Sequence, residues 1–242
     1  MSSFSDHFYL LEKKEQKLLK NTIAYLSTKD KVLLLTTSNR WEKSDDVPKS
    51  TRIARAIEQE LIGKCTLIDV SKLTIYDCEG NVSDASGYHC GTKKSNLEDK
   101  EKNPSGCHRC WASVNHADDE LWKISKELLQ SNAVIFFGSV RWGQANGIYQ
   151  KLIERLTWLE SRHATLQESN ILKNIDAGLI FVGHNWNGKE VLETQKQVLK
   201  FFGFNVPNSL SWNWQFTNNV KDESLKSYKE SPQKFKSDVL EK

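Results

Sequence analysis

Short apolar runs, each too brief for a helix, recur along the chain between longer amphipathic stretches. Runs of β-branched, leucine and aromatic residues bounded by polar ones are typical of strands that are buried on both faces of a sheet. They predict such strands at residues 32–35, 65–70, 133–137 and 177–182. A further strand is predicted at residues 210–216, where large apolar residues alternate with polar ones, so it should lie half exposed at an edge.

Helical periodicity fills the segments between these runs. Apolar residues recur at three- and four-residue spacing, the pattern of a helix with one buried face, in the stretches 8–28, 50–63, 118–130, 148–159 and 191–203. Strands that alternate with helices predict an α/β protein with a doubly wound, five-stranded parallel sheet. Right-handed crossovers give the strand order 2-1-3-4-5 and open a crevice between the loops that follow the first and third strands.

Three segments lie outside this core pattern. Residues 1–30 are predicted to form an N-terminal helical extension ahead of a domain at 31–216, and its helix should cap the sheet or pack on a second subunit. Residues 76–118 form a long insertion, mostly without periodicity, that carries most of the cysteines; loops of this length are usually functional or mobile. Residues 217–242 are charged and rich in lysine. They fit a fraying last helix or a solvated tail, and we favour the tail.

Composition removes several classes of function. The formal charge is only +3, and acidic residues offset the lysines, so no concentrated basic face indicates nucleic-acid binding. No apolar run approaches the roughly 20 residues that span a bilayer, and residues 1–6 lack the apolar core of a signal peptide, so we expect a cytoplasmic protein without membrane insertion. An odd number of cysteines, five, with one Cys-x-x-Cys pair, also favours a reducing compartment.

The loop after the first strand has the composition of a phosphate site. Hydroxyl and amide side chains follow the strand and recur at the start of the next helix, where free backbone N–H groups and the helix dipole favour an anion. The candidate donors are Thr37, Ser38, Asn39, Ser50 and Thr51, with Arg40 or Arg52 as charge partners. An ordinary polar turn with an N-cap serine is the alternative. The chain has no G-x-x-x-x-G-K-[ST] motif, and residues 36–40 lack the acidic residues that would hold Mg²⁺.

Two further loops stand at the carboxyl ends of predicted strands, where open α/β sheets bind ligands. The first, 138–147, carries glycines, amides, Arg141 and Trp142, and the second, 183–188, is a glycine-bounded run with His184 and Trp186. A phosphate group on the first loop of the sheet and a planar ring between these two is the arrangement that flavin mononucleotide (FMN) requires.

Four cysteines of the insertion are candidate metal ligands. Cys107 and Cys110 form a Cys-x-x-Cys turn, and Cys78 and Cys90 could complete a tetrahedral site for structural zinc or an iron–sulfur cluster. His89 and His108 are alternative ligands, whereas Cys65 fits a small buried apolar residue of a strand. Because Cys78 and Cys90 are widely spaced and no second Cys-x-x-Cys occurs, reduced free thiols are the interpretation that we favour.

With these loops, residues 31–216 resemble the flavodoxin-like NAD(P)H-dependent FMN reductase family, which includes the iron–sulfur flavoproteins. The resemblance implies a phosphate loop made of Thr37, Ser38, Asn39, Arg40, Ser50 and Thr51. It places along the isoalloxazine ring Ser139, Val140, Arg141, Trp142, Gly143 and Asn146. It places at the far edge of the ring Gly183, His184, Asn185 and Trp186. The Cys107-x-x-Cys110 pair before Asp118-Asp119 resembles the cysteine segment of the iron–sulfur branch, although the cluster is dispersed here and the 39–50 loop is longer than usual.

The function implied is that of an FMN-dependent NAD(P)H oxidoreductase. Hydride would pass from the nicotinamide to flavin N5 and on to a small-molecule quinone, nitro or flavin-like acceptor, with no obligatory acid–base side chain. The alternative is an FMN electron-transfer protein, with or without an iron–sulfur cluster, that serves a protein partner. A third interpretation is a binding protein stapled by zinc, with an empty crevice. Family members commonly pair over the flavin, so the resemblance also implies a homodimer or a higher homo-oligomer.

Overall fold

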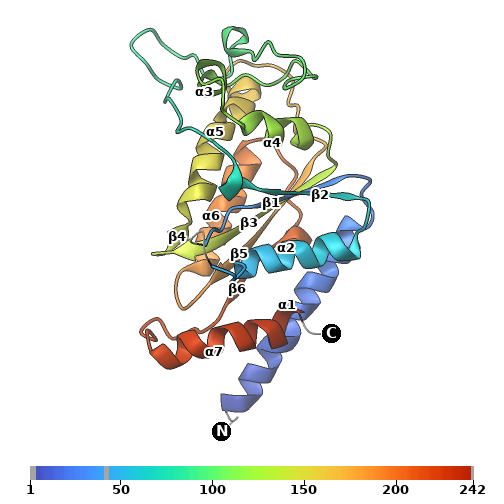
Figure 1. The fold of residues 1–242 in the computed structure, drawn as a ribbon, viewed down its shortest axis with the longest axis vertical. Helices are drawn as coiled ribbons and strands as arrows, with labels where there is room; N and C mark the ends of the chain where they lie inside the picture. The colour runs from blue at the N-terminus through green and yellow to red at the C-terminus, as the bar shows by residue number, and fades with distance from the viewer. Residues whose placement is uncertain (1–3, 41–43, 241–242) are drawn as a thin grey trace.

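The computed structural model describes residues 4–40 and 44–240 of the chain. Its centre is a sheet of five parallel strands in the order β2-β1-β3-β5-β6 (Figure 1). The strands are β1 (Val32–Thr36), β2 (Cys65–Asp69), β3 (Ala133–Arg141), β5 (Asp176–Gly183) and β6 (Ser211–Gln215). The predicted order of the five runs is therefore confirmed. The middle strands β1, β3 and β5 are buried along most of their length, as apolar runs covered on both faces require, whereas β2, expected to be buried as well, is only half-buried because it lies at an edge of the sheet.

Helices cover both faces of the sheet (Figure 1). On one face lie α1 (Phe4–Leu26), α2 (Lys49–Glu60) and α7 (Leu225–Phe235); on the other lie α4 (Leu121–Leu128), α5 (Gly147–Ala164) and α6 (Gly188–Phe201). Side chains alternate between the two layers within each strand: Leu34 packs in the α1, α2 and α7 layer, and Leu35 packs in the opposite layer. Both are fully buried.

The segment predicted as a loop after the third strand is in part a β-hairpin. Strand β3 continues to Arg141, and the short strand β4 (Gln144–Ala145) pairs with it in antiparallel direction. The two residues of the turn, Trp142 and Gly143, have φ values of 50° and 69°. Two successive positive φ angles are the geometry of a tight hairpin turn that matches strand twist. The loop prediction for 138–147 was wrong here because the outer part of β3 is only half-buried and lacks an apolar run.

The solvated tail predicted at the C-terminus was also wrong. Residues 225–240 are helical, first as α7 and then as a wider turn, Lys236–Leu240. Phe235 is fully buried and its ring meets Trp214 edge to face at 5.3 Å, while Val239 is 3% exposed. Helix α1 lies against the same segment, and Thr22 accepts a hydrogen bond from the Trp212 indole at 3.1 Å. No helix of the described residues is long and apolar enough to cross a membrane.

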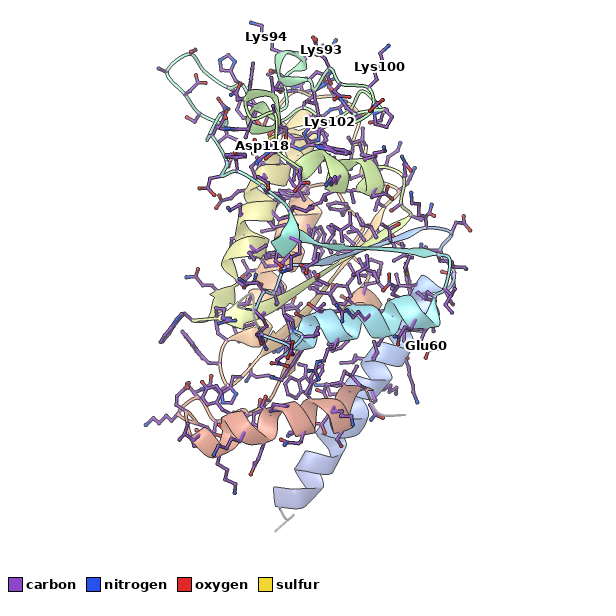
Figure 2. The ribbon with its side chains drawn as sticks, in the orientation of Figure 1. Glu60, Lys93, Lys94, Lys100, Lys102 and Asp118 are labelled. Atoms are coloured by element: carbon purple, nitrogen blue, oxygen red, sulfur yellow. The ribbon has the colours of Figure 1, made fainter. Side chains whose placement is uncertain are left out.

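The segment between β2 and β3, which includes the insertion at 76–118, is held on helix α5. It contains the short helix α3 (Trp111–Asn115) and 3₁₀ turns at Val70–Lys72 and Lys93–Ser95; a third such turn, Asn208–Leu210, precedes β6. The fully buried pair Arg155 and Asp119 joins α5 to the insertion at 2.8 Å, and Arg155 also donates to the Tyr76 carbonyl at 2.7 Å. Figure 2 shows Lys93, Lys94, Lys100 and Lys102 at the outer end of the insertion, away from α7.

Acid is expected to destabilise this insertion through His108. Its ring is 1% exposed and meets the Ser125 hydroxyl at 2.8 Å, and burial lowers the pKa of His108 from 6.5 to about 4. Because the unfolded chain binds the proton more readily, the stability is complete above pH 6.5 and falls as the pH drops towards 4, by about 3 kcal/mol in total. Urea unfolding of the parent and of His108→Leu across this range isolates the effect, since all carboxylates are common to both. Equal slopes in the two proteins would contradict it.

Candidate functional site

The carboxyl ends of β1, β3 and β5 open into one cleft of about 740 Å³. It lies at the point where the chain winds in opposite directions from the middle of the sheet, the position at which doubly wound folds bind ligands. Most of the predicted site residues line it: Ser38, Arg40, Ser50, Ser139, Val140, Arg141, Trp142, Gly143, Gly183, His184, Asn185 and Trp186. The lysines labelled on the insertion in Figure 2 are not among the lining residues.

One end of the cleft is positively charged and rich in donors. Ser38 at the end of β1 and Ser50 in the first turn of α2 are buried, and their hydroxyls bond to each other at 2.9 Å. Arg40 pairs with Asp46 at 3.2 Å, and the half-buried Lys49 lies beside them on the cleft wall. Burial, and then the charge of Arg40, lower the pKa of Lys49. An anion placed here would favour the charged form of Lys49 and so offset both the burial and the repulsion from Arg40.

Lys49 was missed by the sequence analysis, which began the helix at Ser50. Pro48 is the N-cap residue, so Lys49 is the first residue of α2. Proline just before a helix start is a signal that could have located it. Pro48, Lys49 and Ser50 all line the cleft, so the start of α2, whose first N–H groups have no partner within the helix, lies at this end.

Four predicted site residues do not line the cleft: Thr37, Asn39, Thr51 and Asn146. Asn146 is a clamp between strands: its amide nitrogen donates to the Thr37 carbonyl at 2.8 Å, and its amide oxygen accepts from the Ser139 backbone at 2.9 Å. The Thr37 hydroxyl donates to the Phe137 carbonyl. Asn39 is exposed and Thr51 is buried in α2. Thr37 and Asn146 therefore hold together the strand ends that support the cleft, without lining it themselves.

The hairpin and the loop after β5 form one wall. The side chain of Asn187, itself at φ 58°, donates to the Gly143 carbonyl at 2.7 Å. The Trp186 ring lies so close to Gly143 that a Cβ at this position would come within 2.8 Å of two ring atoms. Glycine is required here by both its φ and this contact. Trp142 at the hairpin tip is 93% exposed, and Trp186 is 47% exposed.

The residues that follow β6 form a further wall next to the loop after β5, a part of the site that the tail prediction could not include. Val220, Glu223, Tyr228 and Ser231 line the cleft together with Trp214. The ring of His184, predicted to close the edge of a bound ring, lines the cleft and stacks on Tyr228, with centroids 4.2 Å apart. The stacked His184 ring holds Tyr228 in position in this wall.

The cysteines of the insertion are not arranged as the predicted metal site. No group of three or more histidine, cysteine, aspartate or glutamate side chains within residues 4–40 and 44–240 is placed to hold a metal ion. Cys110 accepts a hydrogen bond from the Arg155 guanidinium at 3.4 Å and shares a small cavity with Cys78 and Cys90, whereas the Cys107 thiol contacts the Ser105 carbonyl. Burial raises the pKa of Cys90 to about 11, which favours its neutral thiol.

Comparison with known proteins bears on the fold. No family model matches the chain, and no curated protein matches it by sequence. Among solved structures, RosB with bound 8-demethyl-8-formylriboflavin-5'-phosphate matches with a TM-score of 0.52 and 15% identity, over 78% of this chain and 66% of that chain. This chain thus spans just under two thirds of the length of RosB. An azoreductase from Bacillus anthracis matches with a TM-score of 0.49 and 10% identity, over 86% and 94% of the two chains. An NADPH-quinone reductase from P. pentosaceus matches with a TM-score of 0.44 and 10% identity, over 88% and 99%. At 15% identity the RosB match shows the flavodoxin-like fold.

Proposed function

We propose that the protein is an FMN-dependent NAD(P)H oxidoreductase that reduces a small-molecule acceptor. The observation that carries the proposal is one cleft with two chemically distinct ends. Its cationic end combines Ser38, Ser50 and Lys49 with the start of α2, and its other end, which we call the ring end, lies between the β3–β4 hairpin and the loop after β5. A ligand with a phosphate tail and a flat ring matches both ends.

The phosphate end fits a dianion by its donors and by its charge. Two hydroxyls 2.9 Å apart, the N-terminal N–H groups of α2 and the Lys49 ammonium would each donate to phosphate oxygens. Asp46 is shared between Arg40 and Arg52, so one carboxylate faces two guanidinium groups and the Lys49 ammonium at this end. The surplus positive charge supports an anionic ligand.

The ring end suits a planar ring. Val140 and Val182 offer apolar contact, and residues 140–143 line the same wall, whereas the Ser139 N–H is already donated to the Asn146 amide oxygen. RosB, which shares the fold, was solved with a flavin phosphate derivative bound, and this supports the same ligand class here. Bound FMN would supply two-electron chemistry between a nicotinamide and an acceptor. The residues of the wall would hold the ring, orient its reactive edge, and stabilise negative charge on it through N–H donors and Arg141.

The test is a titration of the purified protein with FMN, followed by anaerobic addition of NADPH or NADH. We expect micromolar or tighter FMN binding and rapid bleaching of the flavin absorbance by one nucleotide or both. Absence of binding at millimolar FMN would overturn the proposal. Flavin that binds tightly but is bleached only slowly would favour the electron-transfer alternative.

The homodimer implied by the family resemblance stays part of this proposal. Trp142 exposes 93% of its surface at the hairpin tip, the neighbouring Gly143 packs against Trp186, and a second subunit would cover both tryptophans. Light scattering on the flavin-loaded protein gives the oligomeric state directly.

A further inference from the structure

One wall of the cleft is formed by residues that come after β6 in the chain. FMN binding as proposed above does not involve these residues. They are Val220, Glu223, Tyr228 and Ser231, which we call the C-terminal wall. The backbone N–H of Thr217 donates to the His184 carbonyl at 2.8 Å and joins this wall to the loop after β5. The C-terminal wall therefore adjoins the loop after β5 at this part of the cleft.

Two residues of the loop after β5 hold the C-terminal wall in place. The amide of Asn185 donates to the Val220 carbonyl at 3.1 Å and to the Glu223 carboxylate at 2.7 Å. His184 stacks on Tyr228 in nearly parallel planes, 7° apart, and its Nε2 lies 3.1 Å from the Asp222 carbonyl. These contacts fix both a carboxylate and an aromatic ring at the mouth of the site.

The Glu223 carboxylate is a fixed negative charge. It accepts a hydrogen bond from the Tyr228 hydroxyl as well as from Asn185, and these two bonds hold the pKa of Glu223 below its usual value. The neighbouring Asp222 carboxylate is engaged within its own turn, where it accepts hydrogen bonds from the Ser224 hydroxyl and backbone N–H. The cationic groups Arg40 and Lys49 lie at the phosphate end, and Arg141 faces the cleft from the hairpin.

Aromatic side chains frame the same opening. Tyr228 is 49% exposed and Trp186 is 47% exposed, and both line the cleft. Half-exposed rings at a cleft mouth are suited to stacking with a planar partner, and a carboxylate beside them attracts a cation or a hydrogen-bond donor. A partner of this shape would carry a ring and a positively charged or N–H group.

We propose that the C-terminal wall is the docking site of the electron acceptor, and that Glu223 makes it select aromatic acceptors with a cationic or hydrogen-bond-donating group over those with a carboxylate. This inference rests on the proposed function, because it requires a flavin in the remainder of the cleft. Arg141 also acts on charged acceptors, and it is present in every protein compared. The effect of Glu223 is therefore measured as the difference in acceptor preference between the parent and a variant at residue 223.

The experiment uses two nitroarenes that differ only in the para group, aminomethyl in one and carboxylate in the other. NADPH and a solvent proton reduce the nitro group to nitroso and water, and kcat/KM is measured for both in the FMN-loaded parent and in Glu223→Gln. Glu230→Gln is the matched control, because Glu230 is an exposed carboxylate of α7 outside this cleft. Binding of each oxidised nitroarene without NADPH is followed by tryptophan fluorescence.

In Glu223→Gln we expect the ratio of kcat/KM for the cationic over the anionic acceptor to fall roughly tenfold, with a matching change in binding. The shift should shrink at high salt, since the site is open to solvent. An unchanged ratio, or an equal shift in Glu230→Gln, overturns the proposal. FMN affinity and the rate of flavin bleaching by NADPH are measured separately. If Glu223→Gln loses FMN while the ratio stays constant, Glu223 contacts the flavin and not the acceptor. If the parent itself does not bind FMN, the proposed function is refuted.

Discussion

Replacement of Ser50 by aspartate is expected to lower the affinity for FMN by about a hundredfold or more, an effect of roughly 3 kcal/mol or above. Ser50 is 2% exposed, lines the cationic end of the cleft and bonds to the Ser38 hydroxyl. A carboxylate there would stand against the phosphate dianion at a distance of a few ångströms and would remove one donor. Isothermal titration of parent and variant with FMN measures the loss.

Riboflavin is the matched control ligand, because it carries the same ring without the phosphate. Its affinity should be nearly equal in the parent and in Ser50→Asp. The variant should fold, since an acidic residue in the first turn of α2 interacts favourably with the helix dipole. Ser50→Ala, which removes the donor without adding charge, should lose much less. Equal losses for FMN and riboflavin would mean that Ser50 does not hold the phosphate.

The sheet could be predicted because its strands are unusual in sequence. Runs such as residues 133–137 are apolar at every position. A parallel strand that is covered on both faces requires apolar side chains on both of them. Once these middle strands and the two edge strands alternate with helices, the handedness of crossovers leaves few possible orders, and the carboxyl ends of the middle strands must meet. Most of the cleft then follows, which is why the loops after β1, β3 and β5 were identified without coordinates.

The parts that were missed depend on contacts distant in sequence. The C-terminal segment is charged, and its buried residues Phe235 and Val239 are too sparse to form a visible apolar stripe. Its helix also contains Pro232. It is stabilised instead by packing on Trp214 and on α1, so Glu223 and Tyr228 of the cleft wall could not be predicted from local pattern.

The cysteines illustrate the same limit. Spacing alone allowed Cys110 to be a metal ligand, but its partner in the structure is Arg155, which lies far along the chain on α5. The amphipathic pattern of 148–159 assigns Arg155 to a polar face, whereas the insertion folds over that face and buries it fully. A charged residue that is buried by a non-periodic segment leaves no signal in a local window.

Substitution of Arg155 by leucine is expected to destabilise the protein by about 3 to 5 kcal/mol, the cost of leaving a buried charge without its partner. Arg155 and Asp119 are both fully buried and are joined by hydrogen bonds of 2.8 and 3.0 Å. Burial alone would raise the pKa of Asp119, and the bonds from Arg155 and Ser113 bring it below its usual value. Without Arg155 the carboxylate would have to be protonated or exposed. Urea unfolding gives the loss of stability.

The double variant Arg155→Leu with Asp119→Leu separates charge pairing from packing. Replacing both charges by apolar side chains removes the unpaired charge, so its stability should exceed that of Arg155→Leu alone even though more hydrogen bonds are lost. The Tyr76 carbonyl and the Ser113 hydroxyl, which also meet Arg155, would keep part of the deficit. Because neither charged residue lines the cleft, flavin affinity of the folded fraction should match the parent in both variants. A double variant less stable than the single one would mean that the insertion is held on α5 by its hydrogen-bond geometry and not by charge compensation.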